Sequence, residues 1–193
     1  DYSQVTPELR PGDLKLVDYD GNGKIDADDM VRQEDSFTPR FQYGVTVDLS
    51  YKNFDLSLLF QGSQGGVTSL FNGEFGDWGN YYKYQHDNRW SIDNPSRVHP
   101  RLASRGDTWY TAGGYGNNTY NYGSTDYLRL KNLELGYNLP ESILGQGFIS
   151  NFRLYASGLN LLTWTEFDMT DPEVANRTYP LQKVWNLGLR VNF

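Results

Sequence analysis

Six oxygen-bearing positions in residues 18–29, DYDGNGKIDADD, have the types and spacing of a calcium-binding loop. Calcium takes about six to eight oxygen ligands, and alternate positions of one tight loop can supply them. The predicted ligands are the side chains of Asp18, Asp20, Asn22, Asp26 and Asp29, together with the backbone carbonyl of Lys24. We therefore expect Ca²⁺ as a structural ion in this segment.

Two residues refine this expectation. Gly23 stands where the chain of such a loop must turn sharply, and Asp29 occupies the last ligand position in place of the usual Glu. A bidentate ligand would then come from a shorter side chain. The alternative is an Asp- and Gly-rich turn that binds no ion, because Asp, Asn and Gly favour turns on their own. Converging carboxylates would repel one another without a cation, which favours the bound ion.

The composition excludes several function classes. The chain is acidic, with 17 Lys and Arg against 24 Asp and Glu, which argues against a nucleic-acid partner. It has no Cys, so disulfides and thiolate metal sites are excluded, and two His leave little room for a zinc site or a catalytic triad. We find no nucleophile motif and no phosphate loop, so we expect no enzyme activity.

Five segments alternate apolar and polar residues, the pattern of strands with one apolar face. They are YGVTVDLSY (43–51), FDLSLLFQG (54–62), YLRLKNLELGYNLP (127–140), NFRLYASGLNLLTW (151–164) and VWNLGLRVNF (184–193). Lys52–Asn53 predicts a hairpin turn between the first two. The parity of the third segment slips near Lys131–Asn132, which predicts a bulge.

Long and short connections alternate between these strands. Residues 62–123 and 164–182 are long loops without sustained alternation, whereas 52–53 and 139–150 are short, the latter with a helical turn. Strands of about ten residues that join short turns on one rim and long loops on the other are typical of outer-membrane barrels. Five strands cannot close such a barrel, so we expect them to be part of a larger one. The alternative is a β-sandwich, whose strands also alternate.

Five stretches carry a resemblance to a known family. They are PGDLKLVDYDGNGKIDADD, PRFQYGVTVDLSYKNFDLSLLFQGSQGG, NRWSIDNPSRVHPRL, YLRLKNLELGYNLPESIL, and FRLYASGLNLLTWTEFDMTDPE with the final WNLGLRVNF. In this order they resemble the C-terminal part of SusC/RagA-type TonB-dependent outer-membrane transporters. The likeness covers nearly the whole chain.

The resemblance implies an all-β fold, in which the chain supplies the last five strands of a 22-stranded antiparallel transmembrane barrel. Residues 1–40 would form an extracellular loop that contains the calcium loop at 18–29. Residues 41–193 would form the barrel strands, with a long extracellular loop at 62–123.

The resemblance also implies a function and partners. The protein would import nutrients, either oligosaccharides or peptides, across the outer membrane of a Gram-negative bacterium. Partners would be the rest of the same barrel with its plug, TonB through the missing N-terminal part, and a SusD-like surface lipoprotein as a lid. Phe193 resembles the aromatic signal that the barrel-assembly machinery reads.

Two sets of aromatic residues leave alternatives open. One set lies in the long loop, where it could stack on sugar rings, contact a lid protein or pack the loop against itself: Trp78, Tyr81, Tyr82, Tyr84, Trp90, Trp109 and Tyr110. The other set lies near strand ends and predicts an aromatic girdle at the membrane interfaces: Tyr51, Tyr137, Trp164 and Trp185. The second functional hypothesis is a secreted, calcium-stabilised β-sandwich that binds carbohydrate through the loop aromatics.

Overall fold

Long antiparallel strands dominate the fold. The computed structural model describes residues 9–69, 83–103, 118–145, 148–167, 170–174 and 179–193. Its strands are β1 (Phe41–Tyr51), β2 (Phe54–Gln64), β3 (Val67–Ser69), β4 (Tyr122–Ser124), β5 (Tyr127–Asn138), β6 (Asn151–Thr165) and β7 (Val184–Asn192). Its helices are the 3₁₀ turns η1 (Ala27–Asp29), η2 (Thr119–Asn121) and η3 (Pro172–Val174), and the α-helices α1 (Lys83–Asn88) and α3 (Glu141–Leu144). Among these described residues, no helix is both long and apolar enough to cross a membrane.

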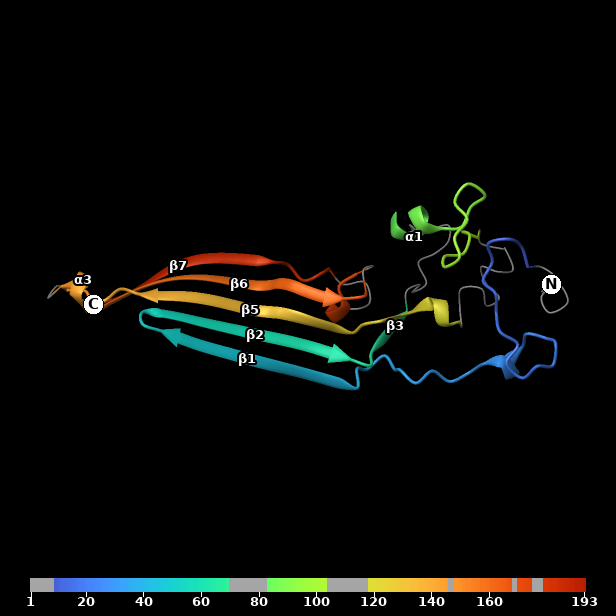
Figure 1. The fold of residues 1–193 in the computed structure, drawn as a ribbon, viewed down its shortest axis with the longest axis horizontal. Helices are drawn as coiled ribbons and strands as arrows, with labels where there is room; N and C mark the ends of the chain where they lie inside the picture. Colours follow the sequence, from blue (N-terminus) through green and yellow to red (C-terminus); the bar gives the residue numbers. More distant parts are fainter. Residues whose placement is uncertain (1–8, 70–82, 104–117, 146–147, 168–169, 175–178) are drawn as a thin grey trace. The chain divides into compact units, whose positions relative to one another are not determined.

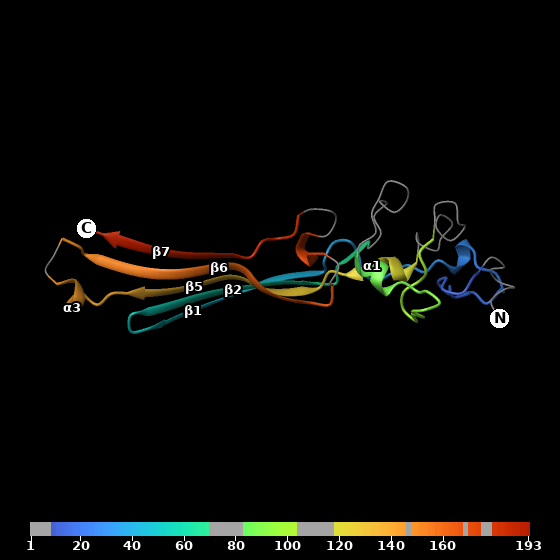
Figure 2. The ribbon, with the colours of Figure 1, turned by 90° about the horizontal axis from the view of Figure 1, so that it is seen from above.

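Five strands form one antiparallel sheet in the order β1-β2-β5-β6-β7. They lie side by side in a single layer (Figures 1 and 2). The five strands predicted from alternation are thereby confirmed. So are the tight turn at Lys52, whose φ is 53°, and the helical turn that follows Pro140.

The bulge predicted near Lys131 is also confirmed. Leu130 and Asn132 pair with Phe60 and Leu59 of β2, so Lys131 has no partner on that strand. The register with β6 shifts at the same place, and Asn160 of β6 has a φ of 53°. This irregularity explains why the segment at 151–164 alternates less cleanly than the others.

The long loop predicted at residues 62–123 contains short regular elements among its described residues. Strand β2 continues to Gln64, and the short strands β3 and β4 pair with each other. Three residues are too few to show a period of two, and the glycines at 62, 65 and 66 interrupt the pattern. Strand β6 likewise continues to Thr165, one residue beyond the predicted segment.

The chain divides into two compact units, which are described separately. One comprises Asp1–Glu34 with Thr68–Gly123, and the other comprises Asp35–Val67 with Ser124–Phe193. In the first unit, Arg101 Nε donates to Asp13 Oδ1 at 2.5 Å, and the Arg101 backbone N–H donates to the Gly12 carbonyl at 2.7 Å. These bonds fasten the segment before the acidic loop to a segment almost ninety residues later. The second unit contains the five-stranded sheet.

Candidate functional site

The acidic loop is folded by its own side chains. The Asp18 carboxylate accepts hydrogen bonds from the backbone N–H groups of Gly21 and Gly23, each at 2.8 Å. Gly21 and Gly23 have φ angles of 76° and 81°, a region that side chains with a Cβ disfavour. The sharp turn predicted at Gly23 is therefore present, and the sequence folds around the first acidic residue.

Three carboxylates of this loop converge. One oxygen from each of Asp18, Asp20 and Asp29 lies within 4.8 Å of the others. Asp29 is fixed in place because its two oxygens accept from the backbone N–H groups of Tyr19 at 2.6 Å and Asp26 at 2.9 Å. The donated N–H groups of Asp26 and Tyr19 lower the pKa of Asp29, so this side chain is held in its charged form.

The side chains of Asn22 and Asp26, two of the other predicted ligands, make hydrogen bonds within the loop. Asn22 donates from Nδ2 to Asp20 at 2.8 Å, and its Oδ1 accepts from the Lys24 backbone N–H at 2.8 Å. The Asp26 side chain accepts from the backbone N–H of Asp28 at 3.0 Å and caps η1. Asp26 is thus engaged at a helix start, and the three-carboxylate cluster does not include it.

These residues fit a hard divalent cation. All three clustered side chains offer oxygen, the ligand type that calcium prefers, and each oxygen that accepts one hydrogen bond keeps a further lone pair. The bonds to Asp18 and Asp29 come from neutral backbone N–H groups, so three formal negative charges remain together. A bound Ca²⁺ would offset two of these three charges and tie the start of the loop to its end.

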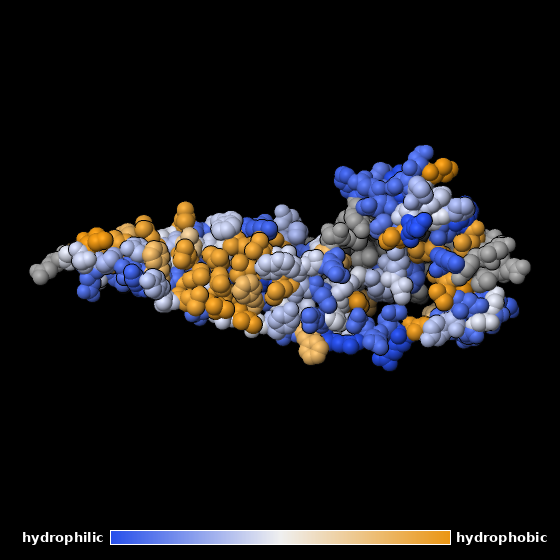
Figure 3. All heavy atoms as spheres, in the orientation of Figure 1, coloured by the Kyte–Doolittle hydropathy of each residue, from blue (hydrophilic) through white to orange (hydrophobic). Residues whose placement is uncertain are grey.

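One face of the five-stranded sheet is apolar and bare. A row of paired residues across all five strands shows this: Leu49, Leu56, Leu135, Ala156 and Leu187. Leu187 is 89 % exposed and Leu49 57 %. Hydrophobic side chains gather over these strands in Figure 3.

This exposure bears on the β-sandwich alternative. In a sandwich, a second sheet covers the apolar face. The other sheet that the described residues form has two strands of three residues each, which is too small to cover five strands of nine to fifteen residues. The apolar face therefore faces something other than a second layer of the described chain.

The opposite face of the sheet is polar and carries a charge cluster. Arg153 of β6 donates to Glu134 of β5 at 2.8 Å and also pairs with Asp55 of β2. Asn138 Nδ2 donates to the same Asp55 at 3.1 Å. Gly136 leaves room for this arrangement, because a Cβ at that position would overlap the Arg153 guanidinium. The sheet thus has one face suited to lipid and one suited to water or protein.

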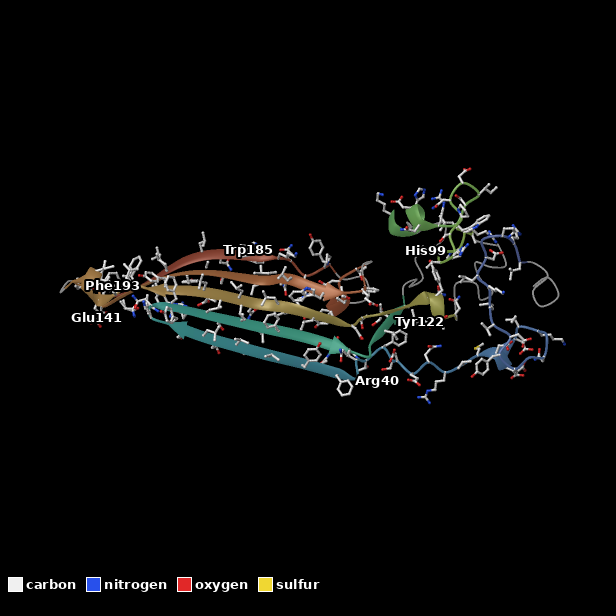
Figure 4. The ribbon with its side chains drawn as sticks, viewed as in Figure 1. Arg40, His99, Tyr122, Glu141, Trp185 and Phe193 are labelled. Carbon is white, nitrogen blue, oxygen red and sulfur yellow. The ribbon has the colours of Figure 1, made fainter. Side chains whose placement is uncertain are left out.

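The predicted girdle aromatics lie on the apolar face. Tyr137 packs against Phe54 with ring centroids 4.6 Å apart, and Tyr51 pairs with Phe54 in the register. Trp164 lies on the same face, near the C-terminal end of β6. Trp185 is the second residue of β7 (Figure 4), but its partner is Gly158, in the middle of β6.

The aromatic residues of the long loop are described only in part. Trp90 lies against Gly12, whose φ is 90°. Trp78, Tyr81, Tyr82, Trp109 and Tyr110 lie outside the described residues, as does the side chain of Tyr84. The binding of sugar or of a lid protein by these residues stays a prediction.

Known proteins are similar to this chain in sequence, and solved structures are similar to it in fold. The chain is 37 % identical over 200 residues to "TonB-dependent receptor P3" and 33 % identical over 200 residues to "TonB-dependent receptor P26", both of Formosa agariphila. These matches cover 95 % and 94 % of this chain but 19 % and 20 % of the relatives. The chain therefore spans about a fifth of their length. No family model matches the sequence.

Solved structures agree. The RagAB peptide importer in its "open-open" state matches with a TM-score of 0.66 and 28 % identity, over 89 % of this chain and 19 % of that one. Its "closed-closed" state matches with a TM-score of 0.67 and 28 % identity, over 92 % and 20 %.

The antiparallel sheet has one bare apolar face and one polar face, and the chain's relatives are TonB-dependent receptors. Together these features define a part of an outer-membrane β-barrel protein. More closely, the chain belongs to the SusC/RagA-type TonB-dependent transporters and corresponds to a C-terminal part of one. The relatives are receptors and transporters, which agrees with the expectation that this chain is no enzyme.

Proposed function

We propose that this chain forms part of the barrel wall of an outer-membrane nutrient importer in a Gram-negative bacterium. The observation that carries the proposal is the exposed apolar face, which is continuous across all five strands and opposite a charged, hydrogen-bonded face. In such barrels the outward face contacts lipid and the inward face is polar. The similarity to TonB-dependent receptors along nearly the whole chain supports the same function.

The ends of the sheet support an orientation. Figure 4 shows Glu141 of α3 and Phe193 at one end of the sheet and Arg40 at the other. Because barrels of this class have short turns on the periplasmic side, we place the Glu141 end there and the long loops outside the cell. Seventeen further strands would complete the 22-stranded barrel that the family resemblance implies, around a plug that connects to TonB.

Phe193 would then lie at the periplasmic end, where the barrel-assembly machinery acts. Its side chain is 75 % exposed and packs beside Phe148, with ring centroids 5.4 Å apart. This position supports its role as the recognised aromatic residue.

The cargo is proposed from the relatives. The solved neighbours are described as a peptide importer, so peptides are the first class to test, with oligosaccharides as the alternative. RagAB is a named complex, which supports a second protein here, and the resemblance points to a SusD-like lipoprotein lid.

We further propose that the 18–29 loop binds Ca²⁺ and staples an extracellular connection. The convergence of Asp18, Asp20 and Asp29 supports it. Outside the cell even weak calcium sites are filled, because sites of extracellular modules need bind only in the range of about 10⁻⁴–10⁻³ M.

Uptake by living cells tests the importer. A strain that lacks the gene would be compared with the same strain complemented by the full-length protein. Each would receive fluorescent peptides and fluorescent oligosaccharides, with and without an uncoupler of the inner membrane. We expect energy-dependent uptake of one class in the complemented strain alone. Equal uptake of both classes in both strains would refute the proposal.

A further inference from the structure

Arg129 of β5 is an arginine buried on the polar face of the sheet. Its side chain is 2 % exposed, and all three guanidinium nitrogens have acceptors. Nη2 donates to Asp171 at 2.8 Å, Nη1 to Glu173 at 2.9 Å and Nε to the Thr163 hydroxyl at 3.0 Å. A buried charge whose three nitrogens each have an acceptor holds its partners in one geometry, because separating them would leave the charge uncompensated.

A second cation completes the cluster. Lys131 Nζ donates to the two carboxylate oxygens of Glu173 at 2.6 and 2.8 Å. We call Arg129, Lys131, Asp171 and Glu173 the ionic anchor. Lys131 is the extra residue of the β5 bulge and has no register partner on β2. The bulge therefore supplies the second cation of the anchor.

The anchor fixes a short turn, residues 170–174, between β6 and β7. Asp171 also accepts from the backbone N–H of Glu173 at 3.0 Å, which closes η3, and from that of Leu181 at 3.3 Å. Pro172 is buried. The turn is therefore tied to the sheet by charge pairs and is stiffened internally.

The register shows which face this turn covers. Arg129 pairs with Gln61 of β2 and Thr163 of β6, and these residues lie on the face opposite the apolar row. In a barrel this face lines the interior. The 170–174 turn is thus folded inward against the wall.

We propose that the 170–174 turn is a fixed constriction of the import passage, and that Arg129 is the positioning residue that holds it there. The inference rests on the proposed importer function. Two cations balance two carboxylates in the anchor, so the turn adds bulk without net charge. The constriction therefore selects cargo by size more than by charge.

The first test measures whether the anchor holds the turn. A Pro172→Cys reporter is introduced into a full-length protein from which any other Cys has been removed; the 193 residues of this chain contain none. Labelling by a membrane-impermeant maleimide is followed on whole cells. We expect slow labelling that rises several-fold with Arg129→Gln, and equally with the pair Asp171→Asn and Glu173→Gln, which removes the charges from the turn.

The matched control is Arg190→Gln. Arg190 also lies on the polar face, on β7, but is outside the anchor. It should leave the labelling rate unchanged. Heat-modifiability on gels verifies that each variant is a folded barrel, and variants that fail this check are replaced by the charge-removing pair on the turn.

The second test measures selection by size. Uptake of fluorescent alanine-glycine peptides of graded length is compared in the parent, Arg129→Gln and Arg190→Gln proteins without the reporter. We expect the ratio of long-peptide to short-peptide uptake to rise several-fold in Arg129→Gln alone. A purely structural role of Arg129 would lower all uptake together and leave this ratio constant.

The outcomes separate the two proposals. Unchanged labelling in both anchor variants overturns the anchor. Faster labelling with an unchanged uptake ratio overturns the constriction and leaves the importer in place. A parent protein that imports no peptide of any length overturns peptide import, and size selection falls with it, while the labelling rates still decide whether the turn is anchored.

Discussion

Leu187 offers a sharp test of which face meets lipid. It lies at the centre of β7, is 89 % exposed, and pairs with Ala156 on the apolar face. Arginine on the lipid face of a barrel costs about 2–4 kcal/mol near the bilayer midplane. Because about 1.4 kcal/mol corresponds to a factor of ten, Leu187→Arg should reduce the folding equilibrium constant roughly 30- to 700-fold.

The neighbouring residue provides the control. Asn186 directly precedes Leu187, so it lies at nearly the same depth along β7. It lies on the polar face, however, paired with Ser157. Asn186→Arg should therefore change stability little. The assay is the fraction of folded full-length protein in lipid vesicles across a urea series, read from heat-modifiability on gels. Equal losses in the two variants would contradict the assignment of the faces, as would a neutral Leu187→Arg.

Three further predictions follow from individual contacts. Asp18→Asn with Asp20→Asn should raise the protease sensitivity of the outer loop as strongly as a chelator does, with the strands intact; no response to chelator in the parent would refute the calcium site. The lowered pKa of Asp29 means that its stabilising hydrogen bonds persist above its ordinary pKa of 3.8 and are lost as the pH falls through the lower folded value. The protection factor of the Tyr19 amide, its exchange rate compared with the intrinsic rate at the same pH, should therefore fall below pH 3.8 but stay constant between pH 5 and 7, and Asp29→Asn should abolish this dependence. Gly136→Val should displace the Arg153 guanidinium and lower the urea midpoint, whereas Gly44→Val should change it less, because a Cβ there meets only the Phe60 carbonyl oxygen at an ordinary contact distance of 3.6 Å.

Much of the sheet could be predicted from the sequence because its pattern is local. Alternation over nine or more residues marks a strand and its apolar face without knowledge of its neighbours. Even the bulge at Lys131 was visible, since it breaks that alternation within one strand. The acidic loop was visible for the same reason, as its spacing lies within twelve residues.

The ionic anchor could not be predicted from the sequence. Arg129 and its partners Asp171 and Glu173 are 42 and 44 residues apart, and they meet because β5, β6 and the turn before β7 are brought together. One signal was present: an Arg and a Lys on either side of Leu130, in a strand whose parity breaks at that point. Strand pairing is needed to say which acids they meet. The capping of η1 by Asp26 is a second feature that the sequence analysis did not predict, because the spacing of the loop assigns the same side chain to the calcium ligands.

The two outermost strands of the sheet, β1 and β7, each have a side without a neighbouring strand among the described residues. Such margins offer free N–H and C=O groups that attract other strands. A polypeptide limited to these residues should consequently aggregate with copies of itself when it is made alone. When it is made together with the rest of the proposed barrel, the two polypeptides should associate through backbone hydrogen bonds along the free edges of β1 and β7. This chain is thus suited to a split-protein design, in which it and the rest of the proposed barrel are made separately and associate without a peptide link.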